Sequence, residues 1–331
     1  MESIENWLRS LLEIRGAHYT YPTLVGSGLL HRIGSRVGKY LPGESCVIIS
    51  DSNVAPLFGN PIKRSLTSAG FRPILIKIPA GEKSKTLEQA GAICDQMIAA
   101  GLDRQSFVVG LGGGVVGDIS GFVAAIYHRG IPHVQIPTTL LAMVDSSIGG
   151  KTGVNTRDGK NLIGAFHHPM LVIDDTDVLK TLPRREFNQG FAEIVKNAVI
   201  ADAKLFEDLK VAPLLNFGHT VGHAIERAGD YRKFLHGEAL SLGIVAACAI
   251  SVKRAGLSPN QRDAIVDLLR QFELPTRLPK NFPSKKIFDA LKFDKKFEGG
   301  KVRFVVTPRI GAAHLVTDVT LQDIREAIED L

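Results

Sequence analysis

Short apolar runs alternate with helix-length segments through the first half of the chain. Five runs rich in β-branched residues read "CVIIS", "FRPILIKIPA", "SFVVGLG", "HVQIP" and "MLVIDD". The segments between them, such as 85–101 and 114–130, have the length and composition of helices. Strands that are apolar on both faces and alternate with helices are typical of a parallel sheet covered on both sides. The pattern therefore predicts an α/β N-terminal domain.

The pattern changes after "LKTLPRREF" (179–187), where Pro183 marks the expected domain boundary. From there to about residue 292, apolar positions recur with the period of a helix. Two late strand-like runs, "KVRFVVTP" and "AAHLVTDV", precede a closing helix with Thr320 as its predicted N-cap and Asp323 three positions on. We expect residues 1–182 to form the α/β domain and residues 183–331 to form a mainly α-helical domain.

Composition and charge narrow the class of protein. The chain has 331 residues, of which 44% are hydrophobic and 22% charged, and its formal net charge is +6. Because no Lys- or Arg-rich run is interleaved with aromatic residues, the charge fits a small anionic substrate better than nucleic acid. Cys46, Cys94 and Cys248 lack paired spacing, which is typical of thiols in a reducing compartment. The N-terminus lacks a signal-peptide pattern and "ALSLGIVAACAIS" is too short to span a bilayer, so we expect a soluble cytoplasmic protein without a membrane partner.

A glycine-rich turn, "VVGLGGGVVGDISGF" (108–122), follows a predicted strand and opens a predicted helix. Gly112, Gly114 and Gly117 fit the G-x-G-x-x-G pattern, which lets the backbone approach a pyrophosphate at a helix N-terminus. Glycines at these positions also pack helices on sheets, and no acidic residue follows about 20 positions on to bind a ribose. If a nucleotide binds here, candidates for its other contacts are Asp51, Asn53, Glu82 and Lys85, each of which is equally explained by turn or cap chemistry.

The segment 135–169, "QIPTTLLAMVDSSIGGKTGVNTRDGKNLIGAFHHP", is a long polar and glycine-rich stretch inside an apolar half. Long loops of this kind in compact domains are usually functional. Its candidate ligand-binding residues are Thr138, Thr139, Asp145, Lys151, Lys160 and Asn161, which follow the end of a strand, where ligands bind in open α/β sheets. The alternative is a solvated loop whose lysines have no role.

Three histidines and one glutamate form a candidate metal site. His219 and His223 are four residues apart in "LLNFGHTVGHAIE" and can share one helix face. His236 follows in "LHGEA", and Glu193 is a carboxylate within an apolar helix. Two imidazoles and a carboxylate with an open position are typical of catalytic zinc. One of the three histidines is then a neighbour or an acid–base group, and spacing alone leaves open which one.

Eight blocks of the sequence resemble the 3-dehydroquinate synthase family of sugar phosphate cyclases. In chain order they are "GLGGGVVGD", "IPTTLLAMVDSSIGGKTGVN", "GKNLIGAFHHP", "LKTLP", "GFAEIVKNAVI", "LLNFGHTVGHAIE", "LHGEA" and "DKK". Together they are far more specific than any one motif. The resemblance implies a Rossmann-like NAD-binding domain, a helical metal-binding domain, zinc or cobalt as the metal, and a homodimer.

The resemblance also implies a role for each matching residue. The metal ligands are Glu193, His219 and His236, and His223 contacts the substrate phosphate or transfers a proton. NAD contacts fall on Asp51, Glu82, Lys85, Gly114, Val115, Val116, Gly117, Asp118, Thr138, Thr139, Lys160, Val178, Leu179, Lys180 and Thr181, with Asn53 and Lys151 as further candidates. Substrate contacts fall on Arg129, Asp145, Lys151, Asn161, Lys196 and Asn216, and on Lys295 or Lys296.

The implied reaction converts 3-deoxy-D-arabino-heptulosonate 7-phosphate into 3-dehydroquinate and phosphate, in the shikimate pathway of aromatic amino acid biosynthesis. It is a carbon–oxygen lyase reaction in which NAD takes a hydride, phosphate is eliminated, the hydride returns and an intramolecular aldol step closes the ring. The alternatives are a related cyclase that makes an inosose or a valiolone, a metal-dependent polyol dehydrogenase, or a chain that binds NAD and zinc without turnover. Relatives of the first kind tend to alter the second histidine of "GHTVGH", and the intact His223 favours dehydroquinate.

The chain departs from the family between "LFEDLK" (205–210) and "LLNFGHT" (214–220). Members of the family carry two further helices there, with a substrate-binding lysine and, just before "LLN", an arginine. This sequence has Ala212 and Pro213 instead. Either the protein is shortened here or a further segment belongs to it. A shortened protein would lack two cations that bind the anionic substrate.

Overall fold

The computed structural model describes residues 11–16, 19–208, 218–229, 233–291, 297–298, 301–302 and 304–331. The chain divides into two compact units, Met1–Pro183 and Arg184–Leu331, so the division falls one residue after the boundary expected from the sequence.

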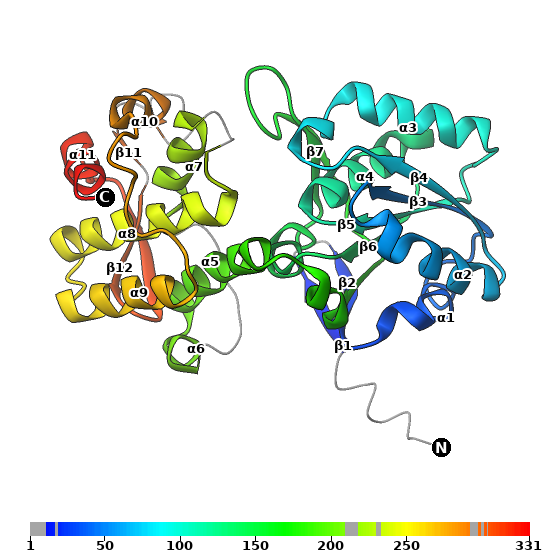
Figure 1. The fold of residues 1–331 in the computed structure, drawn as a ribbon, viewed down its shortest axis with the longest axis horizontal. Helices are drawn as coiled ribbons and strands as arrows, with labels where there is room; N and C mark the ends of the chain where they lie inside the picture. Colours follow the sequence, from blue (N-terminus) through cyan, green and yellow to red (C-terminus); the bar gives the residue numbers. More distant parts are fainter. Residues whose placement is uncertain are drawn as a thin grey trace. The chain divides into compact units, whose positions relative to one another are not determined.

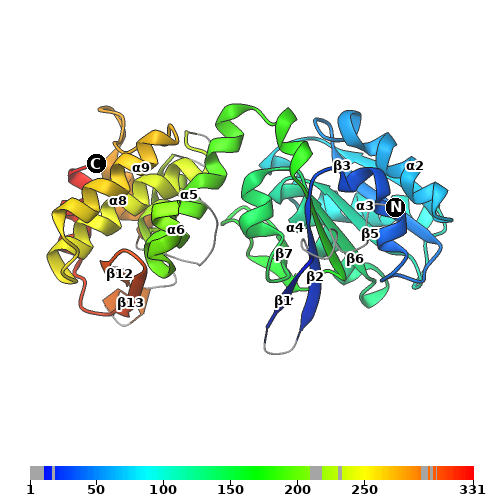
Figure 2. The same ribbon diagram turned by 90° about the horizontal axis from the view of Figure 1, so that it is seen from below.

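Unit 1 is built on a seven-stranded sheet (Figure 1). The strand order is β1 (Leu11–Arg15), β2 (Thr20–Gly26), β9 (Leu171–Asp175), β6 (His133–Pro137), β5 (Phe107–Gly112), β3 (Ser45–Asp51) and β4 (Arg72–Ile78). All neighbours pair in parallel except β1 and β2, which form an antiparallel hairpin at one edge (Figure 2). The five predicted strands are confirmed as β3, β4, β5, β6 and β9, and the α/β fold class is confirmed with them.

Helices cover both faces of this sheet. One apolar cluster joins α1 (Ile33–Val37) and α2 (Asn60–Ser68) to one face of the central strands. A second cluster joins α3 (Leu87–Ala99) and α4 (Gly114–Ile126) to the other face. Burial on both faces explains why the central strands are continuous apolar runs without polar alternation.

The glycine-rich stretch after β6 forms a second small hairpin, β7 (Lys151–Val154) and β8 (Ile163–Phe166), which the sequence pattern did not predict. Gly121 of α4 has no side chain to keep β7 away, and a Cβ there would lie 2.4 Å from Thr152 Cγ2. The missing side chain therefore allows β7 to lie directly on α4.

Unit 2 is mainly helical, as predicted. Its helices are α5 (Arg184–Ala201), α6 (Ala203–Asp208), α7 (His219–Ala228), α8 (His236–Arg254), α9 (Pro259–Gln271), α10 (Ser284–Leu291) and α11 (Leu321–Glu329). Its strands are β10 (Phe297–Glu298), β11 (Lys301–Val302), β12 (Phe304–Arg309) and β13 (Ala312–Val316). The predicted N-cap of α11 is confirmed, because Thr320 Oγ1 accepts from the N–H of Asp323 at 3.1 Å.

The central helix of unit 2 is α8, which contains the apolar stretch "ALSLGIVAACAIS". Among the described residues, it is the one helix long and apolar enough to cross a membrane by length and composition. However, 67% of the most apolar 18-residue segment of this helix is buried. It packs against α5, α7, α9, α11 and β12, which is the position of a core helix.

The three cysteines are free, as expected. Burial raises the pKa of the Cys46 thiol to about 12.

Candidate metal centre and nucleotide-binding edge

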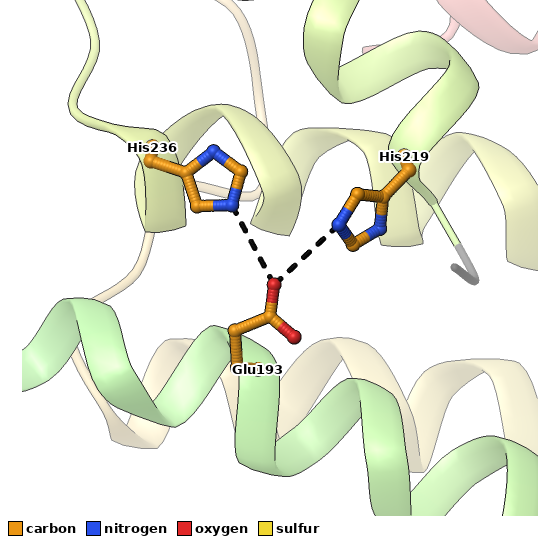
Figure 3. Close-up of side chains that lie close together, drawn as sticks. All are labelled: Glu193, His219 and His236. Atoms are coloured by element: carbon orange, nitrogen blue, oxygen red, sulfur yellow. Dashed lines mark ion pairs between the residues drawn. The ribbon is translucent and has the colours of Figure 1, made fainter. Parts of the chain in front are cut away.

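Three residues from three helices of unit 2 converge on one point (Figure 3). Glu193 lies in α5, and His219 and His236 are the first residues of α7 and α8. Glu193 Oε1 lies 3.5 Å from Nε2 of His219 and 3.5 Å from Nε2 of His236. The three ligand atoms all lie within 4.8 Å of one another. The structure therefore brings together the three residues that the resemblance gave as metal ligands.

Close helix contacts at glycines make this convergence possible. A Cβ on Gly237, next to His236, would lie 2.5 Å from the carbonyl oxygen of Gln189 in α5. A Cβ on Gly243 would lie 2.2 Å from the carbonyl oxygen of Gly218, just before α7. Any side chain at either position would push α8 away from its neighbours, so these glycines hold the histidines near the carboxylate.

The donor set fits a divalent cation such as zinc or cobalt. Glu193 is completely buried, and its Oε1 accepts no hydrogen bond within the described structure. A buried carboxylate oxygen without a donor is costly unless a positive partner satisfies it. Two imidazole nitrogens and one carboxylate oxygen are the ligands that catalytic zinc sites use, with one position left for water or substrate.

Charges around the three residues are closely coupled. Burial lowers the pKa of His219 to about 3, with help from the Lys196 ammonium, so its ring is neutral. Burial also lowers the pKa of His236, but the neighbouring carboxylates of Glu193 and Glu226 outweigh it and raise the pKa to about 10. Burial raises the pKa of Glu193, yet His236 and Lys196 bring it down to about 2. Because a histidine binds a metal through a deprotonated ring nitrogen, a proton and a cation compete for His236.

Lys196 lies one helical turn after Glu193 and is also completely buried. Its Nζ donates to Glu193 Oε2, the carboxylate oxygen that faces away from the two imidazoles. Because Lys196 binds Oε2, the other carboxylate oxygen, Oε1, remains available to bind a metal. Lys196 thus lies where its positive charge acts on the carboxylate.

Glu226 of α7 is a site residue that the sequence interpretation missed. Its Oε2 lies 3.3 Å from Nδ1 of His236, the ring nitrogen that points away from Glu193. A carboxylate behind a metal-binding histidine fixes the ring orientation and tautomer. The signal was present in the sequence, because positions 219, 223 and 226 share one helix face.

His223 lies one turn after His219 and is exposed. Its ring centroid is 5.2 Å from that of His219 and 6.1 Å from that of His236. His223, Glu226 and His236 also form a group whose ligand atoms lie within 4.8 Å of one another. His236 belongs to both groups, and both contain a buried carboxylate. Of the two, the Glu193 group has the carboxylate oxygen, Oε1, that has no hydrogen-bond partner within the described structure and that a cation would satisfy.

In unit 1, the predicted nucleotide-binding residues gather along the carboxyl edge of the parallel sheet. Asp51 ends β3, Gly112 ends β5 and Pro137 ends β6, so that Thr138 and Thr139 follow at the same edge. The first turn of α4 supplies Gly114, Val115, Val116, Gly117 and Asp118, and a short helix after β9 (Thr176–Thr181) supplies Val178, Leu179, Lys180 and Thr181. This is the edge at which open α/β sheets bind ligands.

Several of these side chains already have structural partners. Asp51 Oδ1 accepts from the N–H groups of Asn53 and Val54 at 2.8 and 2.9 Å, which is turn chemistry. Glu82 Oε1 accepts from Asn155 at 2.7 Å. Lys85, which is buried, forms an ion pair with half-buried Asp118. Burial raises the pKa of Asp118 despite this pair.

The remaining candidates of unit 1 lie in or near the β7–β8 hairpin. Asp145 lies close enough to Asp118 for its charge to raise the pKa of that carboxyl, after the larger effect of burial. Lys151 begins β7, and Lys160 and Asn161 lie between β7 and β8. Asn161 has a left-handed φ of 55°, and its N–H donates to Asn155 Oδ1 at 3.0 Å.

Arg129 does not join this group within unit 1. It follows the C-terminal end of α4, whereas the glycine-rich turn is at the N-terminal end, and a helix of 13 residues is about 20 Å long. The role of Arg129 as a substrate contact therefore stays a prediction. Asn216, Lys295 and Lys296 lie outside the described residues.

Known proteins resemble this chain over most of its length. Residues 75–189 match the family model "3-dehydroquinate synthase N-terminal", and residues 210–297 match "3-dehydroquinate synthase C-terminal". A curated 3-dehydroquinate synthase of Symbiobacterium thermophilum is 42% identical over 94% of this chain and 98% of its own length. That alignment extends over 351 residues, more than the 331 of this chain, so the relative has residues without a counterpart here.

Two solved structures share the fold. ValA, the 2-epi-5-epi-valiolone synthase of Streptomyces hygroscopicus with NAD+ and Zn2+ bound, is 28% identical, with a TM-score of 0.84 over 96% of this chain and 98% of its own. A 2-deoxy-scyllo-inosose synthase complexed with carbaglucose-6-phosphate, NAD+ and Co2+ is 24% identical, with a TM-score of 0.86 over 97% and 99%. On the family models and the identity to curated relatives, the chain belongs to the 3-dehydroquinate synthase family.

Proposed function

We propose that this chain converts 3-deoxy-D-arabino-heptulosonate 7-phosphate into 3-dehydroquinate and phosphate, using NAD and a divalent metal. The observation that carries the proposal is the convergence of Glu193, His219 and His236 in a chain 42% identical to a curated 3-dehydroquinate synthase. The related cyclases with NAD+ and Zn2+ or Co2+ bound support both cofactors.

Glu193, His219 and His236 would hold the metal, whose positive charge would polarise the substrate oxygens at the carbon that is oxidised and reduced. NAD, when bound, would take up a hydride there and later return it. The side chains of the protein would hold the substrate next to both the metal and NAD. Buried Lys196 supplies a fixed cation next to the carboxylate, where water cannot screen it fully.

Other side chains are proposed to bind the anionic ends of the substrate. Lys151 extends from the start of β7 with an exposed side chain, which suits binding of a phosphate or carboxylate. His223 is exposed beside His219 and is placed to contact the phosphate or to move a proton. Asp145, Asn161, Asn216, Arg129 and one of Lys295 and Lys296 complete the proposed substrate contacts.

The carboxyl edge of unit 1 is the proposed NAD site. The N-terminus of α4 presents backbone N–H groups and a positive helix dipole, both of which suit a pyrophosphate. Thr138 Oγ1 is buried and has no hydrogen-bond partner within the described structure, so it is a candidate for a nucleotide hydroxyl or phosphate. The Lys85–Asp118 pair, Glu82 and the 178–181 segment would surround the rest of the cofactor. We further propose a cytoplasmic homodimer.

The test is an assay of phosphate release from the heptulosonate phosphate, with NADH absorbance recorded in parallel. A 3-dehydroquinate synthase releases phosphate with no net NADH, whereas a polyol dehydrogenase accumulates NADH. Release from a different sugar phosphate, with none from the heptulosonate, would indicate an inosose or valiolone synthase. If protein loaded with metal and NAD releases no phosphate from any of these substrates, the proposal fails and the chain only binds its cofactors.

A further inference from the structure

Lys151, the proposed substrate cation of unit 1, follows a turn of two glycines. Gly149 and Gly150 both have left-handed φ angles, of 88° and 65°. Two consecutive glycines give the chain more freedom than any other pair. A lysine directly after them can bind an anion tightly only if something else fixes the turn before the substrate arrives.

The turn is fixed by a residue far away in the sequence. The N–H of Gly149 donates to the hydroxyl oxygen of Tyr21 in β2 at 2.9 Å. Tyr21 is only 2% exposed, so the accepting hydroxyl belongs to a buried ring, while Gly149 is half-buried. On the other side of the turn, the carbonyl oxygen of Gly150 accepts from the backbone N–H of His167 at 2.8 Å. The peptide group that precedes Gly149 and the one that follows Gly150 are therefore both held.

Rings from three segments pack around these hydrogen bonds. The ring of His168 is so close to Gly150 that a Cβ there would lie 2.3 Å from Nδ1. Tyr19 stacks on His168 with ring centroids 3.7 Å apart. His167 stacks on buried His133 at 5.0 Å, and its Nε2 lies 2.8 Å from the carbonyl oxygen of Ile131. His167 is thus fixed at the start of β6, and His168 packs on Tyr19.

The backbone of Lys151 is also held on the C-terminal side of the turn, by pairing within the β7–β8 hairpin. Lys151 pairs with Phe166 in the β7–β8 hairpin, and Thr152 Oγ1 donates to the carbonyl oxygen of Ala165 at 2.9 Å. Only the lysine side chain, which is exposed, remains able to move. We propose that Tyr21 is a positioning residue for Lys151, acting through its hydroxyl on the Gly149 peptide. This inference rests on the proposed function, which gives Lys151 an anionic substrate to bind.

The test compares Tyr21→Phe with Tyr19→Phe. Both changes remove one hydroxyl from neighbouring rings, but only the first removes the acceptor of Gly149. Since a neutral hydrogen bond contributes about 0.5–1.5 kcal/mol, we expect Tyr21→Phe to raise KM for the heptulosonate phosphate roughly two- to tenfold. We expect NAD affinity and metal content to stay unchanged, and Tyr19→Phe to leave KM as it is. Equal effects of the two changes on KM would overturn the proposal.

A double-mutant cycle shows whether Tyr21 acts through Lys151. Lys151→Ala should itself raise KM, and in its background Tyr21→Phe should have little further effect. If the two effects simply add, Tyr21 acts elsewhere and the inference is wrong. If Lys151→Ala leaves KM unchanged while the wild-type protein turns over, the inference also fails, but the proposed function stands.

Hydrogen–deuterium exchange gives a measurement that needs no activity. Peptides that cover Gly149–Lys151 should exchange faster in Tyr21→Phe than in the wild type, and at the wild-type rate in Tyr19→Phe. This comparison remains decisive even if the protein releases no phosphate. Unchanged exchange in Tyr21→Phe would show that the hydroxyl does not hold the turn.

Discussion

Replacing Asp174 with asparagine should stabilise the protein near neutral pH and have little effect in acid. Asp174 is the fourth residue of β9 and is 5% exposed, and its Oδ1 has no hydrogen-bond partner within the described structure. Burial raises the pKa of this carboxyl from 3.8 to about 7. A folded-state pKa above the unfolded value means that the folded protein holds the proton more tightly. Stability is therefore lost as the pH rises from about 4 to about 7 and stays level above that range.

The size of the effect follows from the shift of about 3 pH units. At about 1.36 kcal/mol per unit, ionisation of Asp174 costs the folded state up to about 4 kcal/mol at pH 7.5. The asparagine side chain has a similar shape and cannot ionise. The free energy of unfolding of the variant minus that of the wild type should therefore rise by about 1.4 kcal/mol per pH unit between pH 4 and 7, because only the wild type binds the extra proton.

Urea unfolding followed by circular dichroism at several pH values measures this difference. The two units can unfold in separate transitions, and the transition that moves with the substitution reports unit 1. Asp175→Asn is the matched control, because Asp175 accepts from the N–H groups of Gly28, Leu30 and Asp177 and should lose stability when one oxygen becomes an amide. A pH-independent difference for Asp174→Asn would refute the reasoning.

Three substitutions test the metal centre and the carboxyl edge of unit 1, and one mass measurement tests the length of the chain. His219→Ala should abolish metal binding and phosphate release while NAD affinity stays nearly unchanged; normal turnover in metal-free variant protein would exclude His219 as a ligand. Glu226→Gln should lower metal affinity about 10- to 100-fold, measured by competition with a chromophoric chelator, because His236 loses the carboxylate that orients it. Lys85→Met should reduce the free energy of unfolding by about 1–3 kcal/mol because it leaves half-buried Asp118 without its partner, and adding Asp118→Asn should restore much of it. An intact mass near 35.8 kDa would show that the protein is truly shortened between "LFEDLK" and "LLNFGHT".

The central strands could be predicted because burial on both faces leaves a direct trace in the sequence. The runs that became β3 and β5 contain no polar alternation. The β1–β2 hairpin lacks that trace, since β1 is mostly exposed at the sheet edge and β2 contains Pro22. The β7–β8 hairpin was hidden by its glycines, which give no period of their own.

The metal centre could be predicted only in part for a different reason. Helical spacing placed His219 and His223 on one face, but proximity to Glu193 depends on how three helices pack. That packing depends on glycines such as Gly237, whose role is invisible without the neighbouring backbone. Asp51 shows the opposite case, because its position at a strand end suggested a ligand while its carboxylate serves the local turn.

Because Glu193, His219 and His236 come from three separate helices, a bound cation would cross-link α5, α7 and α8. Metal supply then acts on the folding equilibrium of unit 2 as well as on catalysis. Each tenfold increase in free metal above its Kd adds about 1.4 kcal/mol to the free energy of unfolding. The melting temperature of this unit should therefore rise with metal concentration and fall when a chelator is added, whether or not any substrate is present.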